Sequence, residues 1–579
     1  MKTIVRFLAL LGLFTLLVIA GTIAGLIMVA RGAKHVPEHT ILELDLETGL
    51  AEWIPDDVVA QGILGGSPSL RDVVDALDTA RRDDRVRGLL ATFGGTAPAL
   101  AQIQELRDAI KRFRDAGKMT VAYSETFGEA GPGNAAYYLA SAFEKIVLQP
   151  SGDVGLTGML AESPFVKGAL AKLGIEARGD HRYEYKNAWN MFSQESFTDA
   201  HREATTRIME SRFSQMVRDI ARDRKLEESR VRELFDRGPL LGSEAVAAGL
   251  VDEVAYRDGV DDLVRKGRPD ADFMPLADYL AAAGRPHTSG TTIALIYGTG
   301  AVVRGTSGFD PLFQDSTMGS KTVTKAFQDA IDDDDVKAIL FRVDSPGGSY
   351  VASDSIWREV VRAKEKGKPV VVSMGNVAGS GGYFVAMSAD AIVAQPGTIT
   401  GSIGVLNMKM LTRGMWDKIG ITWDEVHTGA ASTIPSGLHD FTPEQWQSFQ
   451  HWLDRIYEDF TTKVAEGRRL PIEKVREIAR GRVWTGEDAK GIGLVDELGG
   501  MDTALAVLRG KLTLGPEDAV KLRVFPVERS FLEKILERGG SPFASVRGIV
   551  QRAKPLTEIA GAILREPEAA VLAMPYGWR

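Results

Sequence analysis

The sequence of 579 residues contains no cysteine. This absence excludes disulfides, cysteine-ligated zinc, iron–sulfur clusters and thiol nucleophiles, so any nucleophile must be an oxygen or an amine. Histidine is scarce as well, with eight in the whole chain. The net charge is −9, and no basic stripe is interleaved with aromatic residues. We therefore expect no binding to nucleic acid.

Sequence signatures of bound cofactors are also missing. The chain shows no cluster of metal-ligating residues, no phosphate-binding loop and no dinucleotide fingerprint. We therefore expect neither a cofactor nor a metal. What is present is an ordinary globular composition, 44% apolar and 25% charged, in a chain long enough for two or more domains.

The N-terminus carries the clearest targeting signal. Phe7 to Ala30 is an uninterrupted uncharged run with basic residues on both sides. As a helix it would cross the hydrocarbon core, and it is longer than the apolar core of ~7–15 residues in a cleavable signal peptide. We expect residues 1–35 to form an uncleaved transmembrane anchor. The basic flanks leave the positive-inside rule undecided, but a short tail ahead of a large domain favours export of the rest.

Most of the remaining chain consists of two similar sequence repeats. The stretch "AYYLASAFEKIVLQPSGDVGLTGM" at 136–159 matches "GYFVAMSADAIVAQPGTITGSIGV" at 382–405, an offset of 246 positions. Matches at nearly the same offset continue on both sides and indicate a duplicated domain. They pair "DDRVRGLL" at 83–90 with "DDDVKAIL" at 333–340, "KLGI" at 172–175 with "KIGI" at 418–421, and "EAVAAGLVDEV" at 244–254 with "EDAKGIGLVDEL" at 487–498.

Each copy alternates short apolar runs with amphipathic stretches. Runs such as "AILFRVD" and "PVVVSM" are typical of buried strands, whereas "SDSIWREVVRAKEKG" carries apolar residues at helical spacing. This alternation predicts an α/β fold with largely parallel strands. We expect a first repeat at 36–290, a second at 291–525, and a C-terminal helical tail at 526–579.

The positions at which the two copies differ point to chemistry. At the offset of 246, Ser380 corresponds to Asn134 and Ser402 to Leu156, so the first copy lacks both hydroxyls. Conversely, Lys186 corresponds to Ser432 and has no equivalent in the second copy. One half therefore keeps serines among glycines, and the other keeps a lysine.

Four motifs, "DSPGG", "GSGGYFVA", "TGSIGV" and the upstream "YKNA", together resemble the long, two-domain form of bacterial signal peptide peptidase, the protease IV family. The resemblance extends over nearly all of the two repeats. It implies tandem domains of the Clp protease and crotonase superfamily, with a catalytic dyad formed by a serine and a lysine from the two halves. The residues that match here are Ser380 and Lys186.

A lysine accepts the proton of a serine only when it is neutral, which requires a pKa well below the reference value of about 10.4. Aromatic neighbours of Lys186, among them Tyr183 and Trp189, are candidates for the burial that would lower it. Ser402 is then expected to hydrogen-bond the lysine amine and orient it.

Two glycines are candidates for an oxyanion hole. Gly381 follows Ser380 at an apparent helix N-terminus, where backbone N–H groups are unpaired. Gly347 lies in the Pro-Gly-Gly turn, where the absence of a side chain lets the backbone approach a substrate carbonyl. Together they would stabilise the negative charge that develops on the substrate oxygen.

The resemblance further implies a serine endopeptidase that degrades remnant signal peptides, as a homotetramer anchored in the bacterial inner membrane with its catalytic domain in the periplasm. Two alternatives stay open. A crotonase-like acyl-CoA thioester hydrolase or hydratase would share the oxyanion loops but would not require a lysine base. A catalytically inactive membrane scaffold would require neither the oxyanion loops nor the lysine. For the C-terminal tail, docking on the protein's own oligomer is favoured over binding along the membrane.

Overall fold

The computed structural model describes residues 35–47, 49–54, 68–95, 97–129, 131–266, 269–310, 315–526 and 572–573. The uncharged run of the predicted anchor lies outside these ranges, and so does nearly all of the predicted C-terminal tail. Within the described ranges, no helix combines the length and the apolar character that crossing a bilayer demands.

The first half of the chain folds around a six-stranded sheet whose neighbouring strands are all parallel. Parallel sheets are covered by helices on both faces, so their strands are apolar on both sides. Leu89 therefore packs into the core on one face of the sheet and Leu90 into the core on the other. In spatial order the strands are β8 (Glu253–Val254), β4 (Lys145–Leu148), β3 (Met119–Ser124), β2 (Val86–Phe93), β1 (Thr40–Asp45) and β9 (Phe273–Pro275).

The second half folds around an eight-stranded sheet in which one pair, β18 and β20, is antiparallel and the other pairs are parallel. The main path of this sheet has six strands, and two more branch from it at β16. The path runs β20 (Val483–Thr485), β18 (Ile399–Gly401), β16 (Val370–Gly379), β14 (Val336–Ser345), β10 (Thr291–Thr299) and β22 (Val520–Phe525), and the branch is β17 (Ala391–Ala394) followed by β21 (Glu497–Leu498).

The two sheets correspond strand for strand. The strands β1, β2, β3, β4, β8 and β9 occupy the places of β10, β14, β16, β17, β21 and β22. In the first half, an antiparallel pair of β5 (Asp153–Val154) and β7 (Leu240–Leu241) occupies the place of β18 and β20. The predicted α/β fold with largely parallel strands is confirmed, and its two sheets match the duplication read from the sequence.

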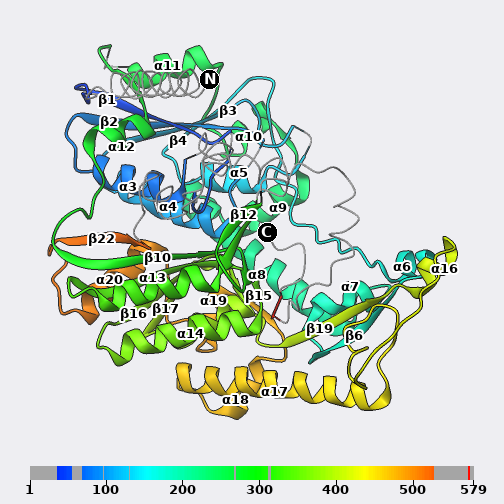
Figure 1. Cartoon of the computed structure of the whole chain (residues 1–579). Coiled ribbons are helices and arrows are strands. Elements are labelled where there is room, and N and C mark those ends of the chain that lie inside the picture. The colour runs from blue at the N-terminus through cyan, green and yellow to red at the C-terminus, as the bar shows by residue number, and fades with distance from the viewer. Residues whose placement is uncertain are drawn as a thin grey trace, which may run out of the picture.

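Helices flank both sheets in the same arrangement (Figure 1). In the first half, α3 (Leu70–Ala80) and α4 (Leu100–Asp115) pack on one face and α11 (Arg257–Arg265) on the other. In the second half, α13 (Ser320–Asp332) and α14 (Tyr350–Glu365) pack on one face and α20 (Met501–Lys511) on the other. Each half also has a long helix, α8 (Asp199–Arg224) and α17 (Pro443–Arg468), followed by a shorter one, α9 (Glu228–Arg237) and α18 (Ile472–Ile478).

The two halves dock through a mixed apolar and ionic interface. Ile208 of α8 joins a small apolar cluster with residues of β16, β18 and β20 in the other half. Arg342 of β14, which is 2% exposed, forms ion pairs with Glu52 at 2.7 Å and with Glu105 at 2.9 Å, both in the first half. A charge buried this deeply is stable only while its partners stay in place, so this cluster fixes the relative position of the halves.

An arm that projects from the body also joins the halves (Figure 1). Its core is a two-stranded antiparallel sheet of β6 (Glu176–Arg182) from the first half and β19 (Val405–Leu411) from the second. Two short helices, α6 (Lys167–Leu173) and α16 (Arg413–Lys418), lie at its tip.

A smaller sheet lies beside the second half. Its strands are, in order, β12 (Gly308–Asp310), β13 (Asp315–Gly319), β11 (Ala301–Val303), β15 (Gly347–Gly348) and β23 (Leu572–Ala573). The last strand comes from the C-terminal segment 526–579 expected to be helical, of which only residues 526, 572 and 573 are described, and it pairs antiparallel with the Pro-Gly-Gly turn.

Candidate active site

Ser380 lies at the end of the central strand β16, where the chain turns into the single-turn helix α15 (Gly381–Phe384). Its backbone has φ 56° and ψ −116°, a conformation that costs a non-glycine residue of the order of 1–3 kcal/mol. Two backbone hydrogen bonds hold it: its N–H donates to the carbonyl of Gly401 at 2.8 Å, and its carbonyl accepts from the N–H of Phe384 at 2.9 Å. Strain of this kind is found where a side chain must be aimed in one direction.

Ser402 follows β18, the parallel neighbour of β16, and is also held with a positive φ, of 52°. In the sheet, Gly379 is paired with Gly401, so the residues that follow them leave the sheet at the same edge. Both serine side chains are fully buried. The carboxyl edge of a parallel sheet is where α/β proteins place their ligand-binding residues.

Lys186 reaches this edge from the first half of the chain. It follows β6 and precedes the 3₁₀ turn η1 (Asn187–Trp189). The N–H of Tyr185 donates to the carbonyl of Arg480 at 3.2 Å, which fixes the segment against the second half. The lysine side chain is 1% exposed.

The structure brings the three predicted side chains together. Lys186 Nζ lies 2.7 Å from Ser380 Oγ, 3.0 Å from Ser402 Oγ and 3.0 Å from the carbonyl oxygen of Ser402. A neutral amine has two N–H donors and one lone pair, so it satisfies these contacts by donating twice to Ser402 and accepting from the Ser380 hydroxyl.

Burial lowers the pKa of Lys186 from its ordinary value to about 7. Removal from water is the physical cause, because a charged ammonium loses its hydration in this enclosure and no carboxylate in the described part of the chain compensates it. Among the aromatic residues expected to shield the lysine, Trp189 is buried, whereas Tyr183 is 49% exposed. The expectation for Tyr183 was wrong because its ring lies against Tyr457 near the surface.

Gly481 encloses the lysine and was not identified from the sequence. A Cβ atom on Gly481 would lie 2.6 Å from both the backbone nitrogen and the Cβ of Lys186, and its φ of +81° is one that glycine adopts readily. Its N–H donates to Ile403 at 2.8 Å, and the carbonyl of Arg482 accepts from the N–H of Ser402 at 2.7 Å. The signal that was available is the segment "RGRV" at 480–483, which matches "RGPL" at 237–240 in the first copy.

The Pro-Gly-Gly turn lies directly against the start of α15. A Cβ on Gly381 would be 3.0 Å from the nitrogen of Gly348 and 3.2 Å from the Cα of Gly347. The φ angles of +100° at Gly347 and +153° at Gly348 are ones that other residues rarely adopt. The N–H of Gly347 donates to Ser345 Oγ at 3.2 Å, so this predicted donor already has a partner.

A buried carboxylate, Asp344, precedes the same turn. It accepts a hydrogen bond from the N–H of Val377 at 2.9 Å. Burial, assisted by repulsion from Glu52, raises the pKa of Asp344 to about 7. Lys186 and Asp344 therefore both have a pKa of about 7.

The corresponding place in the first half has a structural role instead. Asn134, at the position of Ser380, donates through Nδ2 to the carbonyl of Gly158 at 2.6 Å and accepts through Oδ1 from the N–H of Thr157 at 3.0 Å. Both hydrogen bonds tie one loop to the next. With Leu156 in place of Ser402, this site has neither nucleophile nor orienting hydroxyl.

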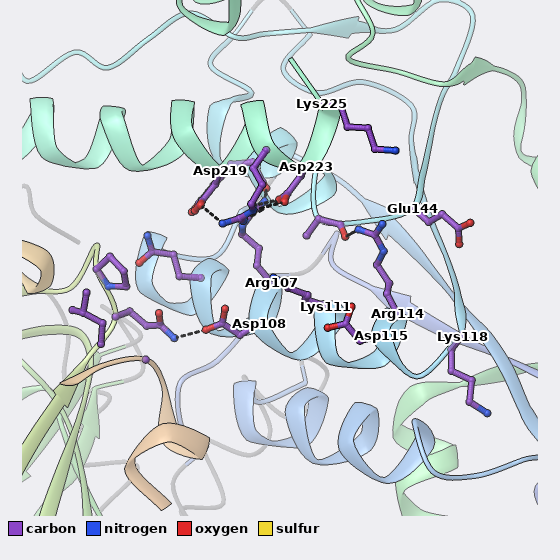
Figure 2. Close-up of a pocket in the computed structure, with 18 of the residues that line it drawn as sticks. Arg107, Asp108, Lys111, Arg114, Asp115, Lys118, Glu144, Asp219, Asp223 and Lys225 are labelled. Atoms are coloured by element: carbon purple, nitrogen blue, oxygen red, sulfur yellow. Dashed lines mark hydrogen bonds and ion pairs between the residues drawn. The ribbon is translucent and has the colours of Figure 1, made fainter. Parts of the chain in front are cut away.

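A cavity of about 790 Å³ lies elsewhere, between α4, the end of α8 and the second half (Figure 2). Charged residues of both signs line it: Arg107 pairs with Asp223, Arg222 pairs with Asp219, and Asp108 accepts a hydrogen bond from Gln395. No dyad residue lines it. Within the described ranges, no group of histidine and acidic side chains is placed to hold a metal ion.

Curated relatives agree on the class of enzyme. Protease 4 of Salmonella typhi is 33% identical over 454 residues, which cover 76% of this chain and 71% of that protein. The chloroplastic serine protease SPPA of Arabidopsis thaliana is 30% identical over 503 residues, 85% and 72% of the two chains. Protease 4 of Haemophilus influenzae is 31% identical over 460 residues, 75% and 71% of the two. The chain is a serine peptidase, and this finding decides against the acyl-CoA and scaffold alternatives.

The family can be stated more narrowly. The sequence profile of Peptidase family S49 matches residues 112–269 and 362–514, one stretch in each half. The chain belongs to peptidase family S49. The duplication therefore repeats the unit that defines the family, whereas the chemically distinctive side chains are divided between the copies.

Proposed function

We propose that the protein is an endopeptidase with a Ser380–Lys186 dyad that degrades signal peptides after their release from exported proteins. The observation that carries the dyad is the 2.7 Å contact between a strained, buried serine and a buried lysine. A serine requires a base to become a nucleophile, and this lysine is the basic group in contact with it. Ser402 acts as the positioning residue, since it holds the amine with its lone pair toward Ser380.

The proposed reaction begins when Ser380 Oγ attacks the peptide carbonyl carbon and its proton passes to Lys186 Nζ. The carbon–nitrogen bond of the tetrahedral intermediate then breaks, and the leaving amine takes the proton from the lysine. A water molecule, deprotonated by the same lysine, then attacks the resulting ester. The bond between the carbonyl carbon and Ser380 Oγ breaks, the lysine returns its proton to Ser380 Oγ, and the acid product leaves. Each step needs a lysine that gains and loses one proton near neutral pH, which suits a pKa of about 7.

For the oxyanion hole we propose the N–H of Gly381 together with a donor of the Pro-Gly-Gly turn. Gly348 suits this role better than Gly347, because its nitrogen faces Gly381 and the N–H of Gly347 is engaged by Ser345. Two N–H groups converging beside a nucleophile stabilise the oxygen that becomes negative in the transition state. Gly347 would supply the donor instead if Ser345 rotated away.

The substrate would bind as an extended strand along β15. Support comes from the chain itself, since Leu572–Ala573 forms an antiparallel pair with Gly347–Gly348. Addition of a strand to a sheet edge recognises the peptide backbone and so accepts many sequences. This mode suits a protease whose substrates share apolar character rather than a fixed sequence.

The choice of signal peptides as substrate rests on two features. The motifs around Ser380 and Lys186 resemble signal peptide peptidase, and the uncharged run from Phe7 to Ala30 would hold the enzyme at the membrane where these peptides are released. We accordingly propose a single-pass anchor in the bacterial inner membrane, a catalytic domain in the periplasm and a homotetrameric assembly.

The test uses the full-length protein in detergent and a synthetic apolar signal peptide, with fragments identified by mass spectrometry. We expect internal cleavage by the wild type and none by Ser380→Ala. Lys225→Ala, which alters an exposed lysine at the end of α8, serves as the matched control and should cleave normally. Cleavage of folded proteins but not of the signal peptide would overturn the substrate, and cleavage by Ser380→Ala would overturn the nucleophile.

A further inference from the structure

The strand that ends at Ser380 contains a bulge shortly before the serine. The register of β14 with β16 is regular up to Val343 and then shifts, so that Asp344 faces residues 375–377 of β16. A bulge bends its strand and redirects the side chains beside it. Ser380 follows the bulge by three positions, so the shape of the bulge bears on the direction in which the serine points.

The side chain of Asp344 fills this bulge. Its carboxylate accepts a hydrogen bond from the N–H of Val377 at 2.9 Å. A Cβ on Gly375 would lie 2.9 Å from both the Cβ and the Cγ of Asp344, so glycine leaves room for the aspartate. The backbone of Asp344 is held from the other side, because its carbonyl accepts from the N–H of Gly300 at 2.9 Å. The carboxylate therefore keeps the bulge in one shape.

Asn376, the middle residue of the bulge, connects it to the first half of the chain. Its Oδ1 accepts from the N–H of Gln102, in the first turn of α4, at 3.2 Å. The side chain of Asn376 also hydrogen-bonds the carboxylate of Asp344, and since Oδ1 is engaged by α4, Nδ2 is the atom that donates. Gln102 donates in turn to Glu52 at 3.1 Å. Hydrogen bonds thus run from the interface between the halves to the bulge.

The first half of the chain lacks this device. At the offset of 250 positions that relates β2 to β14, Asp344 corresponds to Gly94 and Gly375 to Glu125. The pairing of β2 with β3 shows no register shift up to the ends of both strands. The carboxylate and the bulge therefore accompany the nucleophile in one copy and are missing with it from the other.

We propose that Asp344 is a positioning residue for the nucleophile: its carboxylate holds the bulge of β16 that aims Ser380, and Asn376 ties this bulge to the first half. Docking of the halves then sets the direction of Ser380 as well as the approach of Lys186. Asp344 acts through the backbone of β16 and exchanges no proton with the substrate. The inference rests on the proposed role of Ser380 as the nucleophile.

The first test compares two aspartates that make the same kind of bond at opposite ends of β16. Asp390 accepts from the N–H of Val370, the first residue of the strand, at 2.9 Å. Asp344→Ala and Asp390→Ala should both lower the unfolding temperature of the full-length protein. Only Asp344→Ala should lower kcat, by more than about tenfold with KM within about twofold, because a small displacement of the nucleophile is costly in rate.

The second test exchanges the donor and the acceptor. Asp344→Asn leaves two amide groups facing each other and Asn376→Asp leaves two carboxyl groups, so each should lower kcat. The double variant restores one donor facing one acceptor, keeps an acceptor for the N–H groups of Val377 and Gln102, and leaves the net charge unchanged. It should recover most of kcat, whereas a pair that served the fold alone would recover stability without a change in kcat. This series also decides the question if Asp344→Ala does not fold.

A fluorophosphonate probe separates this inference from the proposed function, because it reacts with an activated serine without a peptide substrate. The wild type should be labelled at Ser380, located by peptide mass spectrometry, and Asp344→Ala more than about tenfold more slowly than Asp390→Ala. Equal labelling rates for these two variants, or an exchanged double variant no faster than the slower single one, would overturn the positioning role. Labelling of the wild type at another serine and not at Ser380 would overturn the nucleophile, and with it the positioning role.

Discussion

Lys186 Nζ and Ser380 Oγ lie 2.7 Å apart although 194 positions of the chain separate them. The lysine comes from a segment beyond β6 in the first half, and the serine ends the central strand of the second. Neither half contains both groups, so the contact exists only when the halves dock in one geometry. The ion pairs of the buried Arg342 with Glu52 and Glu105, which also join the halves, stabilise that geometry.

The first prediction concerns the dyad as a unit. Lys186→Ala and Ser380→Ala should each lower kcat for peptide cleavage by at least about 10³-fold. The double variant should be little slower than either single variant, because the serine and the lysine contribute to catalysis only when both are present. Single-turnover kinetics on all three variants measures this, with circular dichroism as the check on folding. Additive losses would show that the two residues act separately.

The second prediction is the pH dependence. Only the neutral amine accepts the serine proton, so kcat/KM should rise as pH increases through about 7 and level off above it. Lys186→Arg should be inactive across the whole range, since a guanidinium stays protonated. A rate that falls through the same range would contradict the assignment of the lysine as base.

Asp344 requires a control of its own, because burial raises its pKa into the same range, to about 7. Asp344→Asn fixes this side chain in a form that resembles the protonated acid. The rise of kcat/KM through about pH 7 should persist in this variant. Loss of the rise would assign it to Asp344 and the turn it precedes.

The third prediction concerns stability. Unfolding returns Lys186 to water, where its pKa is about 10.4, so between pH 7 and pH 10 the unfolded chain binds one proton more than the folded chain. The free energy of unfolding should therefore rise with pH across this window. Lys186→Met removes the group and should stabilise the protein at pH 7, by up to about 4 kcal/mol for a displacement of about three pKa units. Denaturant titrations at pH 7 and pH 9.5 measure the difference, and a wild type more stable than Lys186→Met at pH 7 would contradict it.

The fourth prediction tests the enclosure of the lysine. Gly481→Ala places a Cβ 2.6 Å from the backbone and side chain of Lys186, so the segment must shift, and activity should fall by more than about tenfold. Gly367→Ala is the control, because its φ of +76° imposes a similar backbone strain where nothing lies within 4 Å. Both variants should lose some thermal stability, but only Gly481→Ala should lose kcat. Equal losses of kcat would mean that strain alone, rather than crowding at the lysine, is responsible.

The fifth prediction concerns the buried arginine between the halves. Arg342→Ala leaves two buried carboxylates without a partner and should destabilise the protein by about 3–5 kcal/mol. Arg358→Ala breaks an exposed pair with Glu365 and should leave the unfolding temperature nearly unchanged. The triple variant Arg342→Met, Glu52→Gln, Glu105→Gln should be clearly more stable than Arg342→Ala, because it leaves no uncompensated carboxylate at this place. Differential scanning calorimetry compares the four proteins.

The parts of the site that could be predicted are those in which the two copies of the domain differ. Ser380, Ser402 and Lys186 were recognisable because each has a partner position without its chemistry, and the alternation of apolar runs with amphipathic stretches gave the α/β fold class. Periodicity also gave the strands, since runs buried on both faces read as continuous apolar stretches.

The remainder depends on contacts between segments distant in sequence. Gly481 acts through its approach to a lysine 295 positions earlier, and nothing in its own segment indicates that approach. The occupied N–H of Gly347 depends on the rotamer of Ser345, and the exposure of Tyr183 depends on the place of Tyr457 in the fold. A sequence pattern reports which residue types are present but not which backbone groups face one another.

The division of the dyad between halves has a consequence for synthesis. A ribosome makes Lys186 long before it makes Ser380, and the second sheet is complete only after its edge strand β22 has been made. Until the second half has folded, we expect no contact between Lys186 and Ser380 and so no cleavage of the chain itself or of its neighbours. If the dyad is as proposed, the order of residues along the chain delays cleavage until most of the chain has been made and folded.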